Sequence, residues 1–158
     1  MAKYERERKF LLDEDKCADW RRLAVGHVRI EQGYLSRRKE STVRVRIAGE
    51  QGWLTVKGIT SGDTREEYEY EVPVADARRI MNMCEGLPLE KERWIVPWEG
   101  MTWEVDIFGG QNSGLKLCEV ELPLAFDGDL SMPPFVGEEV TGDVRYYNSA
   151  LVSKCSNS

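Results

Sequence analysis

The sequence predicts an α+β fold in which eight β-strands close into a barrel, with helices packed against the outside. Three observations lead to this prediction. Charged and apolar residues alternate along successive short segments, each of these segments carries charges of mainly one sign, and separate apolar stripes have the spacing of helices. In a barrel, the charged faces point into the lumen, and helices cover part of the apolar outer surface.

The first expected strand, near residues 3–12, carries two acids and a base at alternate positions, namely Glu5, Glu7 and Lys9. In an extended chain these three side chains share one face. Such a face makes a poor core, but it suits a hard cation with an anion bound to it. Taken alone, the pattern is more typical of a solvated edge strand.

Later segments repeat the alternation, and this repetition favours a functional polar surface over a solvated edge strand. The further expected strands lie near 29–36, 42–49, 53–60, 65–73, 89–97, 101–108 and 115–123. Their alternating polar positions, given strand by strand, are Arg44 and Arg46; Thr55 and Lys57; Glu67, Glu69 and Glu71; Lys91 and Arg93; Glu104 and Asp106; and Glu119 and Glu121. Because the sign differs between strands, the pattern indicates a charged surface that is matched by a ligand.

Turns and helices complete the expected fold. Residues 49–52 and 60–64 have the composition of hairpin connections, and the glycine-rich residues 109–114 form a longer loop that matches no phosphate-binding consensus. Apolar residues at helical spacing predict three helices: Cys17, Trp20, Leu23 and Ala24; Ala77, Ile80, Met83 and Cys84, between an Asp76 cap and Gly86; and Val144, Tyr147 and Leu151.

Composition limits the class of protein. The 158 residues are 41% hydrophobic and 32% charged, which predicts one domain, 1–158, that buries its own core. No apolar run is long enough to span a membrane, and the first residues lack a signal-peptide pattern, so we expect a cytoplasmic protein. The four cysteines have no C-x-x-C spacing and only one histidine accompanies them, which predicts reduced thiols and not a zinc site.

The net charge of −6 argues against a nucleic-acid partner, because no lysine-rich face or basic tail is present. An acidic protein still binds a small polyanion if its bases gather in one cavity and metal ions bridge its acids to the ligand. The alternating strands offer this arrangement.

Eight motifs, in this order, resemble those of CYTH domains, the triphosphate tunnel metalloenzymes. They are Glu5-x-Glu7-x-Lys9 followed by Phe10-Leu11, Gln32-Gly33-Tyr34-Leu35, Arg44-x-Arg46, Thr55-x-Lys57, Arg65-x-Glu67-x-Glu69, Glu90-Lys91-x-Arg93, Glu104-x-Asp106 and Glu119-x-Glu121. The resemblance continues through residues 137–141 and 145–148, and it is greatest to the short bacterial branch that hydrolyses inorganic triphosphate. Arg6 departs from the family pattern, in which an apolar residue is usual, and this leaves open how the outer face of the first strand is covered.

The resemblance implies an eight-stranded antiparallel tunnel that binds a triphosphate with Mg²⁺ or Mn²⁺. The implied substrate-binding bases are Lys9, Arg44, Arg46, Lys57, Lys91 and Arg93, and the implied metal ligands are Glu5, Glu7, Glu119 and Glu121. A second group of acids has two equally supported roles. They bind a second metal or orient water, or they simply pair with arginines. These acids are Glu67, Glu69, Glu104 and Asp106. Tyr34, with Lys9, is the candidate for positioning a terminal phosphate or assisting proton transfer.

Three functions fit this expectation. The first is metal-dependent hydrolysis of inorganic triphosphate to pyrophosphate and phosphate. The second is a class IV adenylate cyclase or a thiamine or nucleoside triphosphatase on the same fold, and the third is a non-catalytic module that binds polyphosphate. The sequence does not fix the oligomeric state, and a homodimer is compatible with it.

Overall fold

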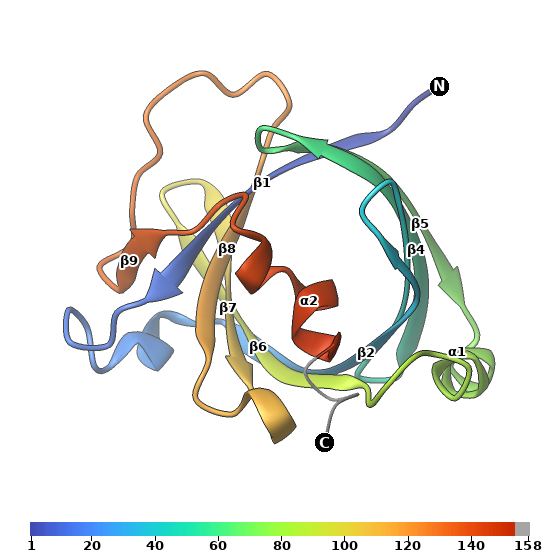
Figure 1. Cartoon of the computed structure of the whole chain (residues 1–158). Helices are drawn as coiled ribbons and strands as arrows, with labels where there is room; N and C mark the ends of the chain where they lie inside the picture. Colours follow the sequence, from blue (N-terminus) through green and yellow to red (C-terminus); the bar gives the residue numbers. More distant parts are fainter. Residues whose placement is uncertain (154–158) are drawn as a thin grey trace.

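The computed structural model describes residues 1–153, in which nine strands form one continuous sheet that closes on itself (Figure 1). The strands are β1 (Tyr4–Leu12), β2 (Gly26–Arg38), β3 (Ser41–Ala48), β4 (Gln51–Ser61), β5 (Thr64–Val72), β6 (Leu89–Trp98), β7 (Met101–Phe108), β8 (Lys116–Leu122) and β9 (Val136–Glu139). The first eight form the barrel in the order β5-β4-β3-β2-β6-β7-β8-β1, and β1 pairs again with β5. All pairs are antiparallel, so the predicted closed barrel is confirmed.

Strand β1 closes the ring by exchanging partners along one edge. Its residues 6–11 pair with β8 on one side, while its first residues, 4–6, pair with β5 on the other side. After residue 6, β1 no longer pairs with β5, and β9 pairs with β1 at Phe10 and Leu12. The sequence did not predict β9, because Pro133 and Pro134 interrupt the chain just before it and the strand is only four residues long.

Alternation along the strands sends charged side chains into the lumen and apolar ones outward. The largest apolar cluster lies on the outer face of β1, β7 and β8, where Phe10, Trp103 and Val120 pack under Trp20 and Phe135 from two loops. The first of these loops contains a single 3-10 turn, η1 (Trp20–Leu23), in place of the longer helix that the spacing predicted. Burial of Trp20 and Phe135 gives this side of the barrel its hydrophobic cover.

Arg6 and Arg8 explain how the polar part of the outer face of β1 is covered. The Arg6 guanidinium binds Asp63 and donates to three backbone carbonyls of the loop that follows β8, those of residues 123, 124 and 126. The Arg8 guanidinium binds Glu139 of β9 through two hydrogen bonds of 2.7 and 2.8 Å. Arg6, the departure from the family pattern, therefore ties two loops to β1 in place of an apolar contact.

Helix α1 (Val74–Met81) packs outside the barrel against β3 and β4. Its close approach requires glycine on the strand, because a Cβ at Gly52 would lie 2.8 Å from the Ala77 Cβ. The helix begins directly after Pro73, so the predicted Asp76 cap is wrong, and Asp76 lies in the first turn. Met83 lies beyond the end of the helix and is exposed, which shortens the predicted apolar stripe.

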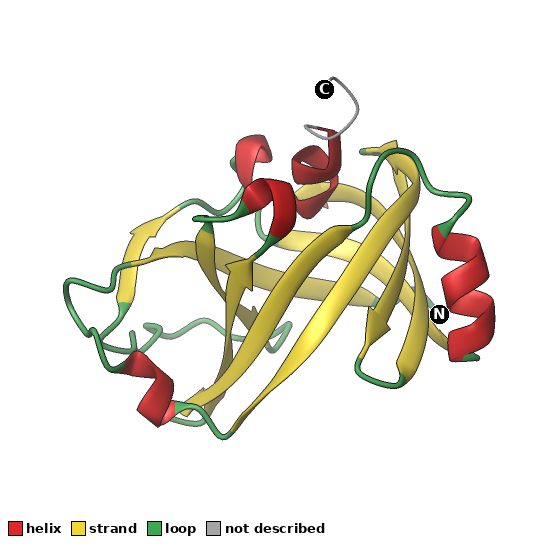
Figure 2. Ribbon diagram, turned by 90° about the horizontal axis from the view of Figure 1, so that it is seen from below, coloured by secondary structure: helices red, strands yellow, loops and turns green. Residues whose placement is uncertain are grey.

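The C-terminal elements, η3 (Val144–Tyr146) and α2 (Asn148–Ser153), differ from the expectation of helices outside the barrel. Figure 1 shows α2 within the outline of the ring, and Figure 2 shows it at one end of the barrel, so it lies across one mouth. Leu151 and Val152 pack there with Tyr34 and Leu89, and this apolar contact holds the helix over the opening.

Two further predictions concern the whole chain. No helix within residues 1–153 is long and apolar enough to cross a membrane. Cys17, Cys84 and Cys118 are free thiols, as predicted, while Cys155 lies outside the described residues.

Candidate functional site

The lumen opens into a cavity of about 740 Å³, a volume that includes its mouth. Glu5, Glu7 and Lys9, the three alternating residues of β1, all line it, as the period of a strand requires. Other strands contribute Tyr34, Arg44, Lys57 and Arg65 to the wall. The structure therefore brings together acids and bases that lie far apart in the sequence.

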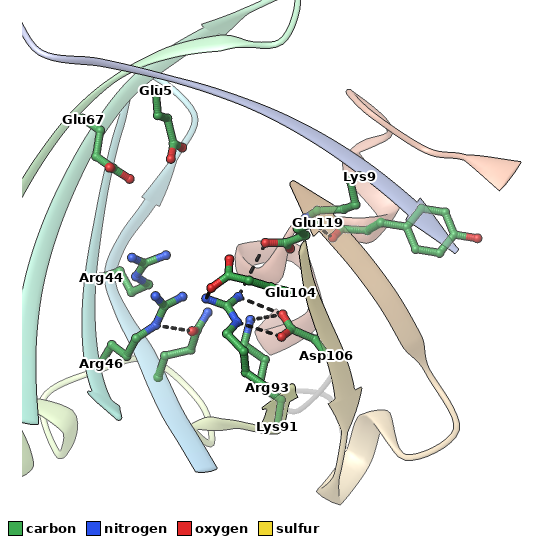
Figure 3. Close-up of polar contacts among 12 residues, drawn as sticks. Glu5, Lys9, Arg44, Arg46, Glu67, Lys91, Arg93, Glu104, Asp106 and Glu119 are labelled. Carbon is green, nitrogen blue, oxygen red and sulfur yellow. Dashed lines mark hydrogen bonds and ion pairs between the residues drawn. The ribbon is translucent and has the colours of Figure 1, made fainter. Parts of the chain in front are cut away.

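One side of the lumen is a buried triad of Lys91, Arg93 and Asp106 (Figure 3). The Asp106 carboxylate accepts hydrogen bonds from Lys91 Nζ at 2.7 Å and from Arg93 Nε and Nη2 at 2.8 and 2.9 Å. Burial lowers the pKa of Lys91 to about 8, although the charge of Asp106 opposes this shift. Arg93 also pairs with Glu104 at 3.2 Å and lies 3.5 Å from Glu119, so the two cations are held by several carboxylates on this side of the lumen.

Arg44 and Arg46, on the neighbouring wall, are the least neutralised bases of the lumen. Arg46 Nε donates to Gln32 Oε1 at 3.0 Å, and within residues 1–153 its guanidinium has no ion-pair partner. Burial, together with the charges of Arg44 and Arg93, lowers the pKa of Arg46 to about 9. Arg44 reaches Glu69 at 3.3 Å, while its buried Nε has no hydrogen-bond partner. An anion between these guanidinium groups would relieve their repulsion and satisfy their free donors.

Two lysines complete the predicted set of bases. Lys57 Nζ lies 2.7 Å from Glu5 and 3.1 Å from Glu67, so it is shared between two acids. Lys9 Nζ donates to the backbone carbonyl of Tyr146 at 3.0 Å and lies 3.4 Å from Glu119. All six bases that the sequence selected therefore point into the lumen.

Among the predicted metal ligands, Glu7 and Glu121 are the carboxylates without a neutralising partner. They lie opposite each other in the β1–β8 register, and neither makes an ion pair within the described part of the chain. Burial, and then the negative charge of Glu119, raises the pKa of Glu7 to about 8. Burial likewise raises the pKa of Glu121, which is more exposed.

Glu119 differs from these two acids because it lies between cations. Burial by itself would raise the pKa of Glu119, but the charges of Lys9, Lys91 and Arg93 lower it to about 2. Its buried Oε1 nevertheless accepts no hydrogen bond. Within residues 1–153 no group of three or more carboxylate, histidine or cysteine side chains is arranged closely enough to hold a metal ion unaided. Glu5, the fourth predicted ligand, is held by Lys57.

The second group of acids lies in ion pairs. Glu67 pairs with Lys57, Glu69 with Arg44, Glu104 with Arg93, and Asp106 with Lys91 and Arg93. The sequence left two roles open for these acids, metal or water binding and pairing with bases. In the described structure all four acids are paired with bases.

Tyr34 is buried against α2 and lines the cavity. Its hydroxyl accepts a hydrogen bond from Gln32 Nε2 at 3.0 Å. No acceptor for the hydroxyl proton is found among the described residues, so this proton remains available to a group in the cavity.

Sequence reasoning missed two contributors to the wall. Arg65 is in phase with Glu67 and Glu69, so the alternation itself contained the signal that it points inward. Thr141, Gly142, Tyr147 and Asn148 also line the cavity, but they belong to the segment around η3 that folds back over the mouth. No local sequence pattern predicts that these four residues line the cavity, because their position depends on where α2 packs.

The lumen of this closed barrel contains clustered bases and, near them, acids without ion pairs among the described residues. This arrangement is typical of the class of proteins that bind a small polyanion together with cations. The CYTH domain profile matches residues 3–147, and the chain belongs to this family. It is 46% identical over 149 residues to the inorganic triphosphatase of Acetivibrio thermocellus, covering 94% of this chain and 92% of that protein. It is 38% identical over 129 residues to the inorganic triphosphatase of Nitrosomonas europaea, covering 78% and 83%.

Solved structures agree with this assignment. The crystal structure of an inorganic triphosphatase aligns with a TM-score of 0.61 and 32% identity, covering 92% of this chain and 95% of that chain. A protein from Pyrococcus horikoshii aligns with a TM-score of 0.62 at 21% identity, covering 77% and 80%, and shares the fold.

Proposed function

We propose that this protein hydrolyses inorganic triphosphate to pyrophosphate and phosphate in a metal-dependent reaction inside the barrel. The observation that carries the proposal is the incomplete neutralisation of Arg44 and Arg46 in the same lumen as Glu7, which makes no ion pair within residues 1–153. Bases without acids and acids without bases in one lumen leave room for an anion and a cation together. The inorganic triphosphatases to which the chain is similar support this function.

The bases perform the binding. Arg44 and Arg46 present planar guanidinium groups that suit bidentate contact with phosphate oxygens, and Lys9 and Lys57 supply compact charge. Arg93 is held by Asp106, Glu104 and Glu119, so its guanidinium group stays in place as charge moves during the reaction. Such preorganised charge is the main contribution a protein makes to phosphoryl transfer.

The acid side fits a divalent cation, although the acids do not form a complete site. Glu7, Glu121 and Glu119, whose Oε1 accepts no hydrogen bond, would hold Mg²⁺ or Mn²⁺, with phosphate oxygens and water completing the coordination. Glu5 shares Lys57 with Glu67, and it would be a further ligand of the cation. When bound, the cation supplies neutralisation of charge on the phosphate oxygens. Mg²⁺ and Mn²⁺ both remain predictions of the sequence.

In the reaction, a water oxygen forms a bond to a terminal phosphorus while the bond from that phosphorus to the bridging oxygen breaks. The bridging oxygen keeps the electron pair and leaves as part of pyrophosphate, and the proton lost by the water passes to a phosphate oxygen or to solvent. We expect the Tyr34 hydroxyl to donate a hydrogen bond to a phosphate oxygen and Lys9 to neutralise charge on the phosphate; both residues line the cavity, which supports these roles. Neither residue forms a covalent bond to the substrate.

Side-by-side kinetics with inorganic triphosphate, ATP and thiamine triphosphate test this function. ATP must leave its adenosine at the mouth, so we expect a kcat/KM for triphosphate at least ~10-fold higher, about 1.4 kcal/mol. Equal turnover of ATP, or the appearance of cyclic AMP, would assign the protein to an organic triphosphatase or cyclase. Binding of triphosphate with metal but without phosphate release would support the polyphosphate-binding module. A cytoplasmic location, a single domain over 1–158 and a homodimer remain predictions of the sequence.

A further inference from the structure

A second cavity adjoins the tunnel at the mouth that α2 partly covers. It has a volume of about 1090 Å³ including its opening, and it shares Thr42, Arg65 and Tyr147 with the wall of the lumen. Arg65 therefore stands at the junction of the two spaces. Any molecule that enters the tunnel from this side passes Arg65.

The charged residues that line this second cavity are all cations: Arg37, Lys39 and Arg65. Within residues 1–153 the Lys39 ammonium has no hydrogen-bond or ion-pair partner, and Arg65 makes no ion pair. The Arg65 guanidinium donates only to the neutral Gly58 carbonyl and the Thr42 hydroxyl, at 2.5 and 2.6 Å. Only Arg37 is neutralised, by Glu85 at 3.1 Å. The mouth is thus locally positive.

This local charge opposes that of the whole protein. The chain has a net charge of −6, so its average field repels a polyanion such as triphosphate. A cationic mouth offsets this repulsion within about a Debye length, roughly 10 Å at 0.1 M salt. Most bases of the lumen are buried and paired with acids, so they add little to the field outside the mouth.

We propose that Lys39 and Arg65, with Arg37, form an outer anion-binding subsite that captures an oligophosphate before it moves into the tunnel. The inference rests on the proposed function for the identity of the anion. The subsite holds its ligand loosely, because it is open to solvent and part of its lining is formed by exposed apolar side chains, Ile59 (60% exposed) and Val144 (64% exposed), which offer no hydrogen bonds. Loose binding suits capture and passage inward, whereas the lumen retains the anion.

Charge reversal at Lys39 tests the subsite. Lys39→Glu should lower kcat/KM for inorganic triphosphate ~10-fold at low ionic strength through KM, with kcat unchanged, and this difference should shrink as salt screens the field. The control is Arg79→Glu, which changes the net charge equally at an exposed position of α1 without an ion pair in the described structure. It should stay within about twofold of the unmodified protein at every salt concentration.

Three results would overturn the subsite: equal kcat/KM for the two variants, a fall in kcat instead of a rise in KM, or a defect that salt does not reduce. Thermal melting of both variants checks that they fold. If the unmodified protein fails to hydrolyse triphosphate, the proposed function fails, and the subsite is then judged by calorimetric titration with triphosphate. In that case, weaker binding to Lys39→Glu than to Arg79→Glu supports it, and equal binding refutes it.

Discussion

Replacing Glu7 by glutamine should stabilise the metal-free protein at alkaline pH while reducing its activity. Glu7 is a partly buried carboxyl without an ion pair, beside Glu119, and its pKa is raised from 4.5 to about 8 by burial and then by that neighbour. A raised carboxyl pKa means that the folded state prefers the protonated form. The folded wild type therefore loses stability as pH rises from about 4.5 to 8, where the unfolded chain is already ionised.

The size of this loss follows from the two pKa values. At about 1.4 kcal/mol for each unit, the difference between 4.5 and 8 corresponds to at most about 5 kcal/mol. Glu7 is not fully buried, and solvent and small movements reduce the penalty, so we expect ~1–3 kcal/mol at pH 8. Glutamine has nearly the same shape and does not ionise, so Glu7→Gln should escape this penalty. For a domain of this size the gain corresponds to a melting temperature roughly 3–10 °C higher.

The assay is thermal and urea unfolding of both proteins in EDTA, at pH 5 and pH 8. The two curves should nearly coincide at pH 5 and separate at pH 8, with the variant more stable. Adding Mg²⁺ at pH 8 should narrow the gap, because a bound cation restores the wild type by mass action. Glu50→Gln, in an exposed turn, is the matched control and should change neither curve.

A constant difference between Glu7→Gln and wild type at the two pH values would refute the assigned titration. A variant less stable than wild type at pH 8 would show that the Glu7 charge is compensated by contacts that the structure does not contain.

The remaining predictions concern the metal, the basic wall and the buried triad. Chelation by EDTA should abolish triphosphate turnover, Mg²⁺ or Mn²⁺ should restore it, and Glu121→Gln should raise the metal concentration needed; full activity in excess EDTA would contradict this. Arg46→Ala and Lys57→Ala should each lower kcat/KM by one to several orders of magnitude, at about 1.4 kcal/mol per decade, without unfolding the chain. Arg79→Ala is the control for them, since Arg6 and Arg8 hold Asp63 and Glu139 and are unsuitable. Asp106→Asn should lower the free energy of unfolding by ~3–5 kcal/mol, because two buried cations lose their shared anion. Urea unfolding measures this loss of stability, and Asp127→Asn in an exposed loop is the control. Equal stability of the two variants would show that the triad does not stabilise the barrel wall.

The sequence by itself determined which side chains enter the lumen. A strand turns successive residues to opposite faces, so the phase of Glu5, Glu7 and Lys9, or of Arg44 and Arg46, follows from local order alone. The same periodicity located all eight barrel strands to within a few residues. It was less informative for helices, because short stripes such as the one that includes Trp20 satisfy helical spacing and still form one turn within a loop.

Only the tertiary structure decided which charges are neutralised. Asp106 and Glu121 have the same alternating pattern, yet Asp106 lies between Lys91 and Arg93, whereas Glu121 makes no ion pair within residues 1–153 and lies opposite Glu7. Partners in a barrel are set by strand order, register and closure. The β6–β7 pairing brings Asp106 to Lys91 and Arg93, 15 and 13 positions away, and closure of the ring brings Glu5 to Lys57, 52 positions away. The same holds for α2, whose apolar stripe could be read but whose place over the mouth depends on a surface that exists only once the ring has closed.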